Sequence, residues 1–414
     1  MLNEAIELNE REPVGGLLNM PAEINGRHVE NRVVIQPMEG CDCEPDGSPG
    51  ELTWRKYLRY AKAGAGVIWL EASAVCPEGR TNPRQMCLTE ENLDDFRRFT
   101  DAVRDTAEKE CGFSPLLILQ LTHSGRQSMT PLIAYHNPIY EANAPLRDEN
   151  IATDEYLDAL PDKFAHTAAL AVRAGFDGVD VKACHGYLMQ ELLSGYVRAG
   201  RYGGSLENRS RAYINSFDAV KAAVPGRFAV TARLGLSDMV KKPWGFGTDE
   251  EGNLDLSEPK LLVGKLIGKG LELLNVTIGN PYYNPHVNRP FRVGAYKAPE
   301  TPETGIGRFY EVEKEIKATF PALKVVASGI SYYRENLMEK AEELLADGAC
   351  DFVGFGRGCL AYPSFYRDYL AGVFDPKKCC VACSKCTFLM RAHCVSGCAT
   401  FDDYYKKLYK EKGL

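Results

Sequence analysis

The fold of this chain is indicated most clearly by residues 177–211, which read DGVDVKACHGYLMQELLSGYVRAGRYGGSLENRSR. Gly178–Lys182 has the β-branched residues of a short buried strand, and a Tyr-Gly-Gly turn precedes a helix expected over Ser205–Val224. Ser205 is a good N-cap for that helix, because its hydroxyl can accept an otherwise unpaired backbone N–H. The stretch therefore predicts a strand, a long loop and a helix.

Lys182, His185 and Tyr187 stand together where this strand ends. Taken singly, a buried Tyr or His is more often structural than catalytic. Three such side chains at the carboxyl end of one strand instead predict a catalytic loop, because that end carries the function in strand-then-helix units.

The same alternation of a strand and a helix occurs eight times along the chain. The expected strands are Val33–Met38, Val67–Glu71, Pro115–Leu121, Gly178–Lys182, Phe228–Leu234, Leu273–Ile278, Lys324–Ser328 and Asp351–Phe355. The expected helices are Leu52–Ala63, Asn92–Lys109, Asp162–Ala174, Ser205–Val224, Leu256–Lys269, Arg308–Phe320, Arg334–Ala346 and Tyr362–Leu370. Alternation predicts an α/β protein with a parallel sheet, and eight repeats favour a closed (β/α)₈ TIM barrel over an open doubly wound sheet.

Polar residues at the strand ends indicate a flavin mononucleotide (FMN) pocket. Glycines of Gly354-x-Gly356 together with Arg357 can hold a phosphate after strands seven and eight. The Gln120 amide can pair with the pyrimidine edge of the flavin, and Arg233 can stabilise negative charge near N1 of the reduced ring. Structural alternatives exist for both Gln120 and Arg233, since a strand-end arginine, for example, often pairs with a carboxylate.

Charge and hydropathy exclude several classes of partner. The net charge is −7 with acidic and basic residues interspersed, so we expect neither nucleic acid nor an anionic membrane surface as a partner. Residues 1–16 hold no apolar targeting segment, and no later run approaches about 18 apolar residues. A soluble, cytoplasmic protein with a small-molecule substrate is expected.

Six of the 14 cysteines lie between Cys379 and Cys398, which indicates metal or redox chemistry. Cys380, Cys383 and Cys386 are each separated by two residues, and Cys398 can supply a fourth ligand. Four thiolates suit [4Fe–4S] or Zn, and the spacing alone leaves these two open. We expect a barrel over residues 1–378 and a small cluster-binding extension over residues 379–414.

Eight segments carry a resemblance to a known family. They are NRVVIQPM, GAGVIWLEASAVCPEGR, ILQLTHSGR, HGYL, YGGSLENRSR, VTARLG, VASGI and DFVGFGRG, and the resemblance runs from about Asn31 to Cys398. Together they resemble the Old Yellow Enzyme family of flavin-dependent ene-reductases, and most of all its iron–sulfur branch, which includes 2,4-dienoyl-CoA reductase and trimethylamine dehydrogenase. The resemblance implies FMN contacts at Met38, Ala72, Gln120, Arg233, Gly329, Gly356 and Arg357.

The resemblance also bears on the cysteines. The branch has nearly this pattern after its barrel, which favours [4Fe–4S] bound by Cys380, Cys383, Cys386 and Cys398 over Zn and leaves Cys379 and Cys394 as spectators. A cluster of this kind suits an anaerobic cytoplasm.

Two positions depart from the family pattern. Many relatives hold the substrate carbonyl with two His, or His and Asn, whereas this chain has Lys182 in the first place and His185 in the second. Glu39 stands after Pro-Met, where relatives often have Thr or Cys near the flavin. The carbonyl contact is therefore expected to be partly cationic.

The expected reaction is hydride transfer from reduced FMN to the alkene of an α,β-unsaturated carbonyl compound. Enoyl-CoA thioesters, unsaturated acids and steroid or bile-acid enones are all open as substrates. The resemblance makes Tyr187 the proton donor, while Lys182 and His185 stabilise the carbonyl oxygen. Two alternatives stay open: an oxidative amine demethylase, and an electron-transfer subunit with no substrate of its own.

The source of electrons is a separate question. Relatives such as dienoyl-CoA reductase continue with FAD and NADPH domains, whereas this sequence ends sixteen residues after Cys398. We therefore expect either NAD(P)H acting directly at the barrel mouth, with a structural cluster, or a separate donor such as an FAD-containing NAD(P)H reductase, a ferredoxin or a flavodoxin.

Overall fold

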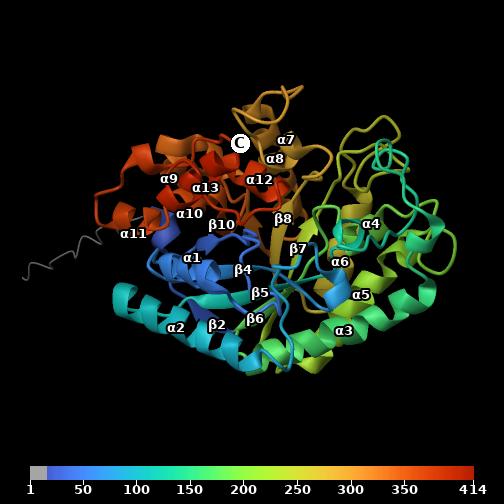
Figure 1. The fold of residues 1–414 in the computed structure, drawn as a ribbon, viewed down its shortest axis with the longest axis horizontal. Coiled ribbons are helices and arrows are strands. Elements are labelled where there is room, and N and C mark those ends of the chain that lie inside the picture. Colours follow the sequence, from blue (N-terminus) through green and yellow to red (C-terminus); the bar gives the residue numbers. More distant parts are fainter. Residues whose placement is uncertain (1–15) are drawn as a thin grey trace, which may run out of the picture.

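Eight parallel strands close into a barrel in the computed structural model of the chain, which describes residues 16–414 (Figure 1). Neighbours follow the chain order, and β10 pairs with β3 to close the ring. The strands are β3 (Val33–Ile35), β4 (Val67–Ala74), β5 (Leu116–Thr122), β6 (Gly178–Val181), β7 (Ala229–Gly235), β8 (Leu273–Thr277), β9 (Lys324–Ala327) and β10 (Phe352–Phe355). The (β/α)₈ barrel predicted from the sequence is confirmed, and the amino-terminal stretch expected to lack a targeting segment lies almost entirely outside the described residues.

Helices surround the barrel and return the chain between strands. They are α1 (Glu51–Ala61), α2 (Leu93–Cys111), α3 (Asp154–Arg173), α5 (Leu206–Ala223), α6 (Ser257–Gly268), α8 (Pro302–Thr319), α9 (Leu337–Ala346) and α11 (Phe365–Leu370). The predicted N-cap of α5 is confirmed, because the Ser205 side chain accepts a hydrogen bond from the Asn208 N–H. None of the helices between residues 16 and 414 combines the length and apolar character needed to cross a bilayer.

Two helices begin earlier than the sequence indicated. The expected start of α3 was residue 162, but Thr153 caps it and the helix runs through Pro161, a residue usually found at helix starts. The expected start of α8 was residue 308, but the Thr301 side chain caps it at Pro302. Shorter helices were not expected at all: α4 (Leu188–Leu193), α7 (Pro285–Asn288) and α10 (Arg357–Ala361).

A small hairpin of β1 (Ala22–Ile24) and β2 (Arg27–Val29) closes the amino-terminal end of the barrel. Ile24 and Val29 pack in one apolar cluster with inward-facing barrel residues such as Trp69. The Asn25 side chain donates to the carbonyl of Phe228, just before β7. Because side chains fill this end, the open end of the barrel is the one at which the strands finish.

Residues 379–414 lie over that open end, in the upper half of the view in Figure 1, and include α12 (Lys385–Arg391) and α13 (Asp403–Glu411). Leu389, Ala399 and Tyr405 belong to a small apolar cluster of this segment. The Ser396 N–H donates to the Gly40 carbonyl at 2.7 Å, which ties the segment to the loop after β3. The boundary at residue 379 stays a prediction.

Candidate active site

A cavity of about 840 Å³ opens at the carboxyl ends of the strands, where a barrel places its active site. All ten residues predicted to bind FMN or to act on the substrate line it. They are Met38, Ala72, Gln120, Lys182, His185, Tyr187, Arg233, Gly329, Gly356 and Arg357. The structure therefore brings together residues that are up to about 320 positions apart in the sequence.

The catalytic loop after β6 turns sharply. His185 and Gly186 both have left-handed backbones, with φ of 66° and 70°. This conformation costs a non-glycine residue about 1–2 kcal/mol, so the surrounding structure must hold His185 there. At Gly186 a Cβ would lie 2.4 Å from the Asn280 side chain, which only glycine avoids. The turn places His185 and Tyr187 in the cavity before α4 begins at Leu188.

The Tyr187 side chain is buried and surrounded by three polar groups. Its hydroxyl donates to Oε2 of Glu39 at 3.2 Å and lies 3.4 Å from the Tyr282 hydroxyl. The Lys182 ammonium lies 3.8 Å from the centre of the Tyr187 ring, within the range of a cation–π contact. Burial raises the pKa of Tyr187 well above its usual value, and the charge of Glu39 raises it further. The phenol is therefore protonated at neutral pH.

Lys182 and His185 differ in charge. Burial lowers the pKa of Lys182, while the charges of Cys184 and Glu39 oppose the shift. Burial also lowers the pKa of His185 well below its usual value, and the positive charges of Arg233 and Lys182 add to the effect. At neutral pH His185 is a neutral imidazole, so of these two side chains Lys182 is the one that can carry a positive charge into the cavity.

Asp180, on β6 beneath the cavity, positions two of the predicted flavin contacts. Its Oδ2 accepts from the Gln120 amide at 2.6 Å and its Oδ1 accepts from the Arg233 backbone N–H at 2.5 Å. Burial raises the pKa of Asp180 to about 6, although these hydrogen bonds oppose the shift. The Arg233 guanidinium does not use Asp180: its Nε is buried and has no partner within residues 16–414. An anion-stabilising group left unpaired in the cavity fits the electron-rich edge of a flavin.

The far side of the cavity fits a phosphate. Gly329 has a φ of 90° and precedes a 3₁₀ segment, Ile330–Asn336, and Gly356 precedes α10. A Cβ at Gly356 would come within 3.1 Å of the Met38 sulfur, so a glycine here avoids crowding the cavity wall. Arg357 donates to the Pro290 carbonyl through Nη2, while its Nη1 is buried without a partner among the described residues. These groups would hold the phosphate of FMN.

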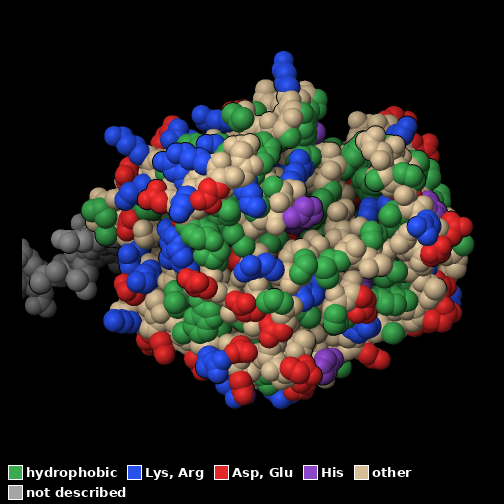
Figure 2. All heavy atoms as spheres, viewed as in Figure 1, with side chains coloured by type: hydrophobic (Ala, Val, Ile, Leu, Met, Phe, Trp, Pro, Cys, Tyr) green, Lys and Arg blue, Asp and Glu red, His purple; other side chains and the backbone are tan. Residues whose placement is uncertain are grey.

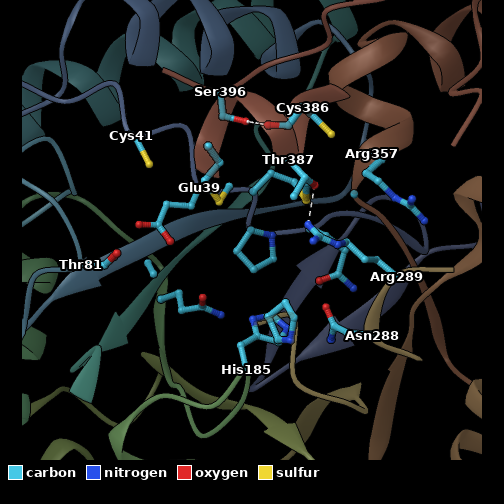
Figure 3. A pocket seen from close by; sticks show the side chains of 18 of the residues that line it. Glu39, Cys41, Thr81, His185, Asn288, Arg289, Arg357, Cys386, Thr387 and Ser396 are labelled. Atoms are coloured by element: carbon cyan, nitrogen blue, oxygen red, sulfur yellow. Dashed lines mark hydrogen bonds between the residues drawn. The ribbon is translucent and has the colours of Figure 1, made fainter. Parts of the chain in front are cut away.

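Sequence reasoning missed three arginines that line the cavity, Arg84, Arg289 and Arg391, of which Arg289 is the most buried. Arg289, after α7, donates to the Thr387 hydroxyl of α12 and has an unpartnered buried Nε in the described chain. Burial lowers the pKa of Arg289 to about 10, and the positive charges of Arg357 and Arg391 add to the shift. Figure 3 shows Arg289 beside Arg357, with Glu39 across the cavity and His185 below. The loop that carries Arg289 has no sequence motif that would mark this residue. Sequence reasoning also missed Asp180, although a carboxylate within an apolar strand was a usable signal.

Cys380, Cys383, Cys386 and Cys398 line a second, smaller pocket, and neither Cys379 nor Cys394 lines it. Cys379 packs in the barrel core instead, and Cys394 packs in the small cluster of the extension. Ala382 and Ser384, on either side of Cys383, have φ of 51° and 59°, which wraps the loop around this pocket. In residues 16–414 no group of three or more His, Cys, Asp or Glu side chains is arranged to hold a metal ion.

The four thiols still fit an iron–sulfur cluster by type and place. Cysteine thiolates are the ligands of [4Fe–4S], and the Ala382 N–H already donates to the Cys380 sulfur at 3.4 Å, a contact that such clusters use. Burial raises the pKa of Cys398 to about 12 in the absence of a metal. Cys386 and Arg357 line both pockets, so the two sites share a wall.

Comparison with known proteins gives the family. The model of the NADH:flavin oxidoreductase / NADH oxidase family matches residues 18–273, more than half of the chain. The chain belongs to this family. That result confirms the family resemblance inferred from the sequence, and its flavin cofactor agrees with the cavity described above.

Two curated relatives and one solved structure illustrate the similarity. The chain is 27% identical over 364 residues to an NADH oxidase of Thermoanaerobacter brockii. The matched region covers 86% of this chain and 51% of that protein. It is 28% identical over 358 residues to an NADPH dehydrogenase of Bacillus subtilis, covering 84% and 92%. A structure of 2-naphthoyl-CoA reductase with 2-naphthoyl-CoA matches 95% of this chain and 58% of its own, with a TM-score of 0.77 and 20% identity. The chain thus spans about half the length of some relatives and nearly all of others.

Proposed function

We propose that this protein is an FMN-dependent reductase of activated alkenes. The observation that carries the proposal is the single cavity in which an unpaired Arg233 faces the same space as Tyr187, Lys182 and His185. Arg233 suits a flavin. Tyr187, Lys182 and His185 suit a carbonyl compound whose alkene gains a hydride and a proton. Bound FMN would supply the hydride.

The chain's own residues then have two tasks. Lys182 and His185 donate to the carbonyl oxygen, where negative charge develops as the β-carbon is reduced, and donors fixed in advance lower the barrier most. Tyr187 holds a proton at its hydroxyl for the α-carbon, because its raised pKa keeps the phenol protonated at neutral pH. Glu39 orients that hydroxyl through the 3.2 Å hydrogen bond.

The charge of the cavity favours anionic substrates. Arg84, Arg289 and Arg391 line it in addition to Arg233 and Arg357, against one carboxylate, Glu39. Enoyl-CoA thioesters and unsaturated acids carry negative charges that these arginines can bind. Amine oxidation is the second candidate, favoured by one observation: Oε1 of Glu39 is buried without a partner in the described residues and could bind an ammonium group.

We further propose that Cys380, Cys383, Cys386 and Cys398 bind [4Fe–4S]. Their shared pocket supports this, as does its common wall with the flavin cavity. A cluster there would lie where electrons can pass to the flavin, and NAD(P)H or a separate protein would be the original donor.

One experiment tests the main proposal. The purified protein is reconstituted with FMN without oxygen, its flavin is reduced, and reoxidation is followed with enoyl-CoA thioesters, unsaturated acids, steroid enones and methylamines. Rapid reoxidation by an α,β-unsaturated carbonyl compound supports the proposal. Failure to bind FMN, or turnover of amines alone, would overturn it; the absorbance spectrum of the bound flavin distinguishes the first result from the second.

A further inference from the structure

We infer that the outer face of the carboxyl-terminal extension is the docking surface for an acidic electron-carrier protein. This basic face consists of Lys377, Lys378, Arg391, Lys406, Lys410 and Lys412, all of them exposed. The inference rests on the proposed iron–sulfur cluster, because docking there would deliver electrons to it. The carrier is defined by its chemistry: a negatively charged protein that donates one electron at a time.

Charge is distributed unevenly along the chain. Residues 376–414 hold eight Lys and Arg and three Asp and Glu, a net charge of +5, whereas the whole chain has −7. The interspersed charges seen in the sequence therefore do not extend to this segment. Figure 2 shows several Lys and Arg side chains at the upper left, near the elements that Figure 1 labels α9 and α13, with Asp and Glu side chains beside them. A local positive field on an acidic protein attracts an acidic partner and speeds its association.

The positive charge of this face exceeds the negative charge of the acids around it. Of the three acids in residues 376–414, the buried Asp402 is paired with Arg55 and Arg59 of α1, whereas the exposed Asp403 forms no salt bridge with a described residue. Lys407 lies 3.8 Å from Glu411, but no carboxylate of residues 16–414 pairs with Lys406, Lys410 or Lys412. Isolated exposed charges contribute little to stability, so their concentration here calls for another reason.

Two exposed aromatic side chains lie on the same segment as the basic residues. Phe401 is 37% exposed and Tyr404 is 48% exposed, both in or just before α13. Exposed aromatic rings near cations match the composition of protein interfaces, in which aromatic residues are enriched at the centre and charge lies at the rim. A solvated charged helix alone would not require these rings to be outside.

The segment that carries the basic face also borders the cysteine pocket. Phe401 and Thr400 line that pocket together with Cys398, and the Thr400 hydroxyl lies 3.2 Å from the Cys383 sulfur. Lys385 lies over the ring of Tyr409 on α13, 5.3 Å from its centre. A protein docked against Phe401 and α13 would therefore lie beside side chains that line this pocket. Nucleic acid or an anionic membrane would also be attracted by the charge, but neither would use this proximity.

The electron count is simple. Each encounter oxidises the carrier by one electron and reduces the cluster by one. Two encounters supply the two electrons that reduction of one C=C bond requires, and the two protons come from water, one of them through Tyr187.

The test uses the full chain with FMN and cluster in place. An acidic bacterial ferredoxin, reduced beforehand and freed of reductant, is mixed with it anaerobically, and the second-order rate of ferredoxin oxidation is measured against ionic strength. Lys406→Glu/Lys410→Glu reverses two charges of the basic face; Lys109→Glu/Lys265→Glu reverses two exposed charges on α2 and α6. We expect the first variant to slow the reaction at least about tenfold at low salt and the control to stay within about twofold, with the difference lost near about 0.5 M salt, where charges are screened.

Equal rates for both variants, or no dependence on salt, would overturn the docking surface. Iron and sulfide analysis is made separately: a protein without iron refutes the cluster proposal and this one together, whereas a loaded protein with unaffected rates refutes this one alone. Reduction of both variants by dithionite at the wild-type rate shows that they are folded. If the variant instead loses binding to a DNA duplex or to phosphatidylglycerol vesicles, with ferredoxin oxidation unchanged, the face belongs to that partner and the inference is wrong.

Discussion

The hydroxyl of Tyr187 donates a hydrogen bond to Glu39 across the mouth of the barrel, over a distance of 3.2 Å. The two residues come from loops after β6 and β3, which are not adjacent strands. Glu39 replaces the Thr or Cys expected from the family pattern, so this chain couples its proposed proton donor to a carboxylate. The other carboxylate oxygen of Glu39, Oε1, is buried without a partner in the described residues.

Tyr187→Phe should separate the two half-reactions. Without its hydroxyl, reoxidation by an alkene should slow about 10²-fold or more, because the proton for the α-carbon is lost, while reduction of the flavin proceeds normally. Stopped-flow absorbance measures both rates. Tyr283→Phe, an exposed neighbour that does not line the cavity, is the control. Equal slowing of both half-reactions would assign the proton to water or His185.

We expect Glu39→Gln to stabilise the folded protein at neutral and alkaline pH but not at acidic pH. Burial raises the pKa of Glu39 from 4.5, so the folded state binds this proton more tightly than the unfolded chain does. The carboxyl group therefore destabilises the fold increasingly as pH rises above about 4.5, the usual Glu value. The variant's unfolding temperature should exceed that of the wild type at pH 8 and equal it near pH 4. A constant difference at both pH values would contradict this.

Arg233→Met should weaken FMN binding without unfolding the barrel. A hydrogen bond to a charged group contributes about 1.5–3 kcal/mol, which predicts about 10- to 150-fold weaker binding. Quenching of flavin fluorescence on titration gives the dissociation constant. As a control, Arg201→Met removes an exposed arginine that pairs with Asp158, and it should leave the dissociation constant of FMN unchanged. Unaltered affinity in Arg233→Met would mean that this arginine does not contact the flavin.

Cys398→Ala and Cys394→Ala form a matched pair for the cluster. The first removes a thiol of the cysteine pocket, and the second removes one that packs in the apolar cluster beside it. We expect loss of iron, sulfide and the broad visible absorbance for Cys398→Ala alone. If Cys394→Ala has the stronger effect, the fourth ligand is misassigned. Stoichiometric zinc with no iron in the wild type would refute the cluster itself.

The fold was predictable because its signals are local. Each strand, such as Gly178–Val181, is a short apolar run followed by an amphipathic helix, and eight such units leave few topologies. The cavity followed from the same logic, since every strand end faces one mouth. Helix starts were less certain because a proline gives the same signal inside α3 as it does at the start of a helix.

The residues that sequence reasoning missed act through distant partners. Arg289 becomes part of the cavity only because Thr387, about a hundred positions later, accepts from it. Asp180 is defined by contacts with Gln120, Trp69 and Arg233, which come from three other strands. No local pattern records such pairings. They depend on how the barrel closes and on where the extension lies.

The extension forms part of the cavity as well as carrying the cysteines. Cys386, Thr387, Met390, Arg391, His393, Val395 and Ser396 all line the large cavity. A protein shortened to its barrel would therefore have an incomplete flavin pocket, open to water on the side where Arg289 is now held. The two parts are consecutive in the sequence, but they are not interchangeable modules: this barrel cannot be transplanted, or paired with a different carboxyl-terminal segment, without rebuilding its active site.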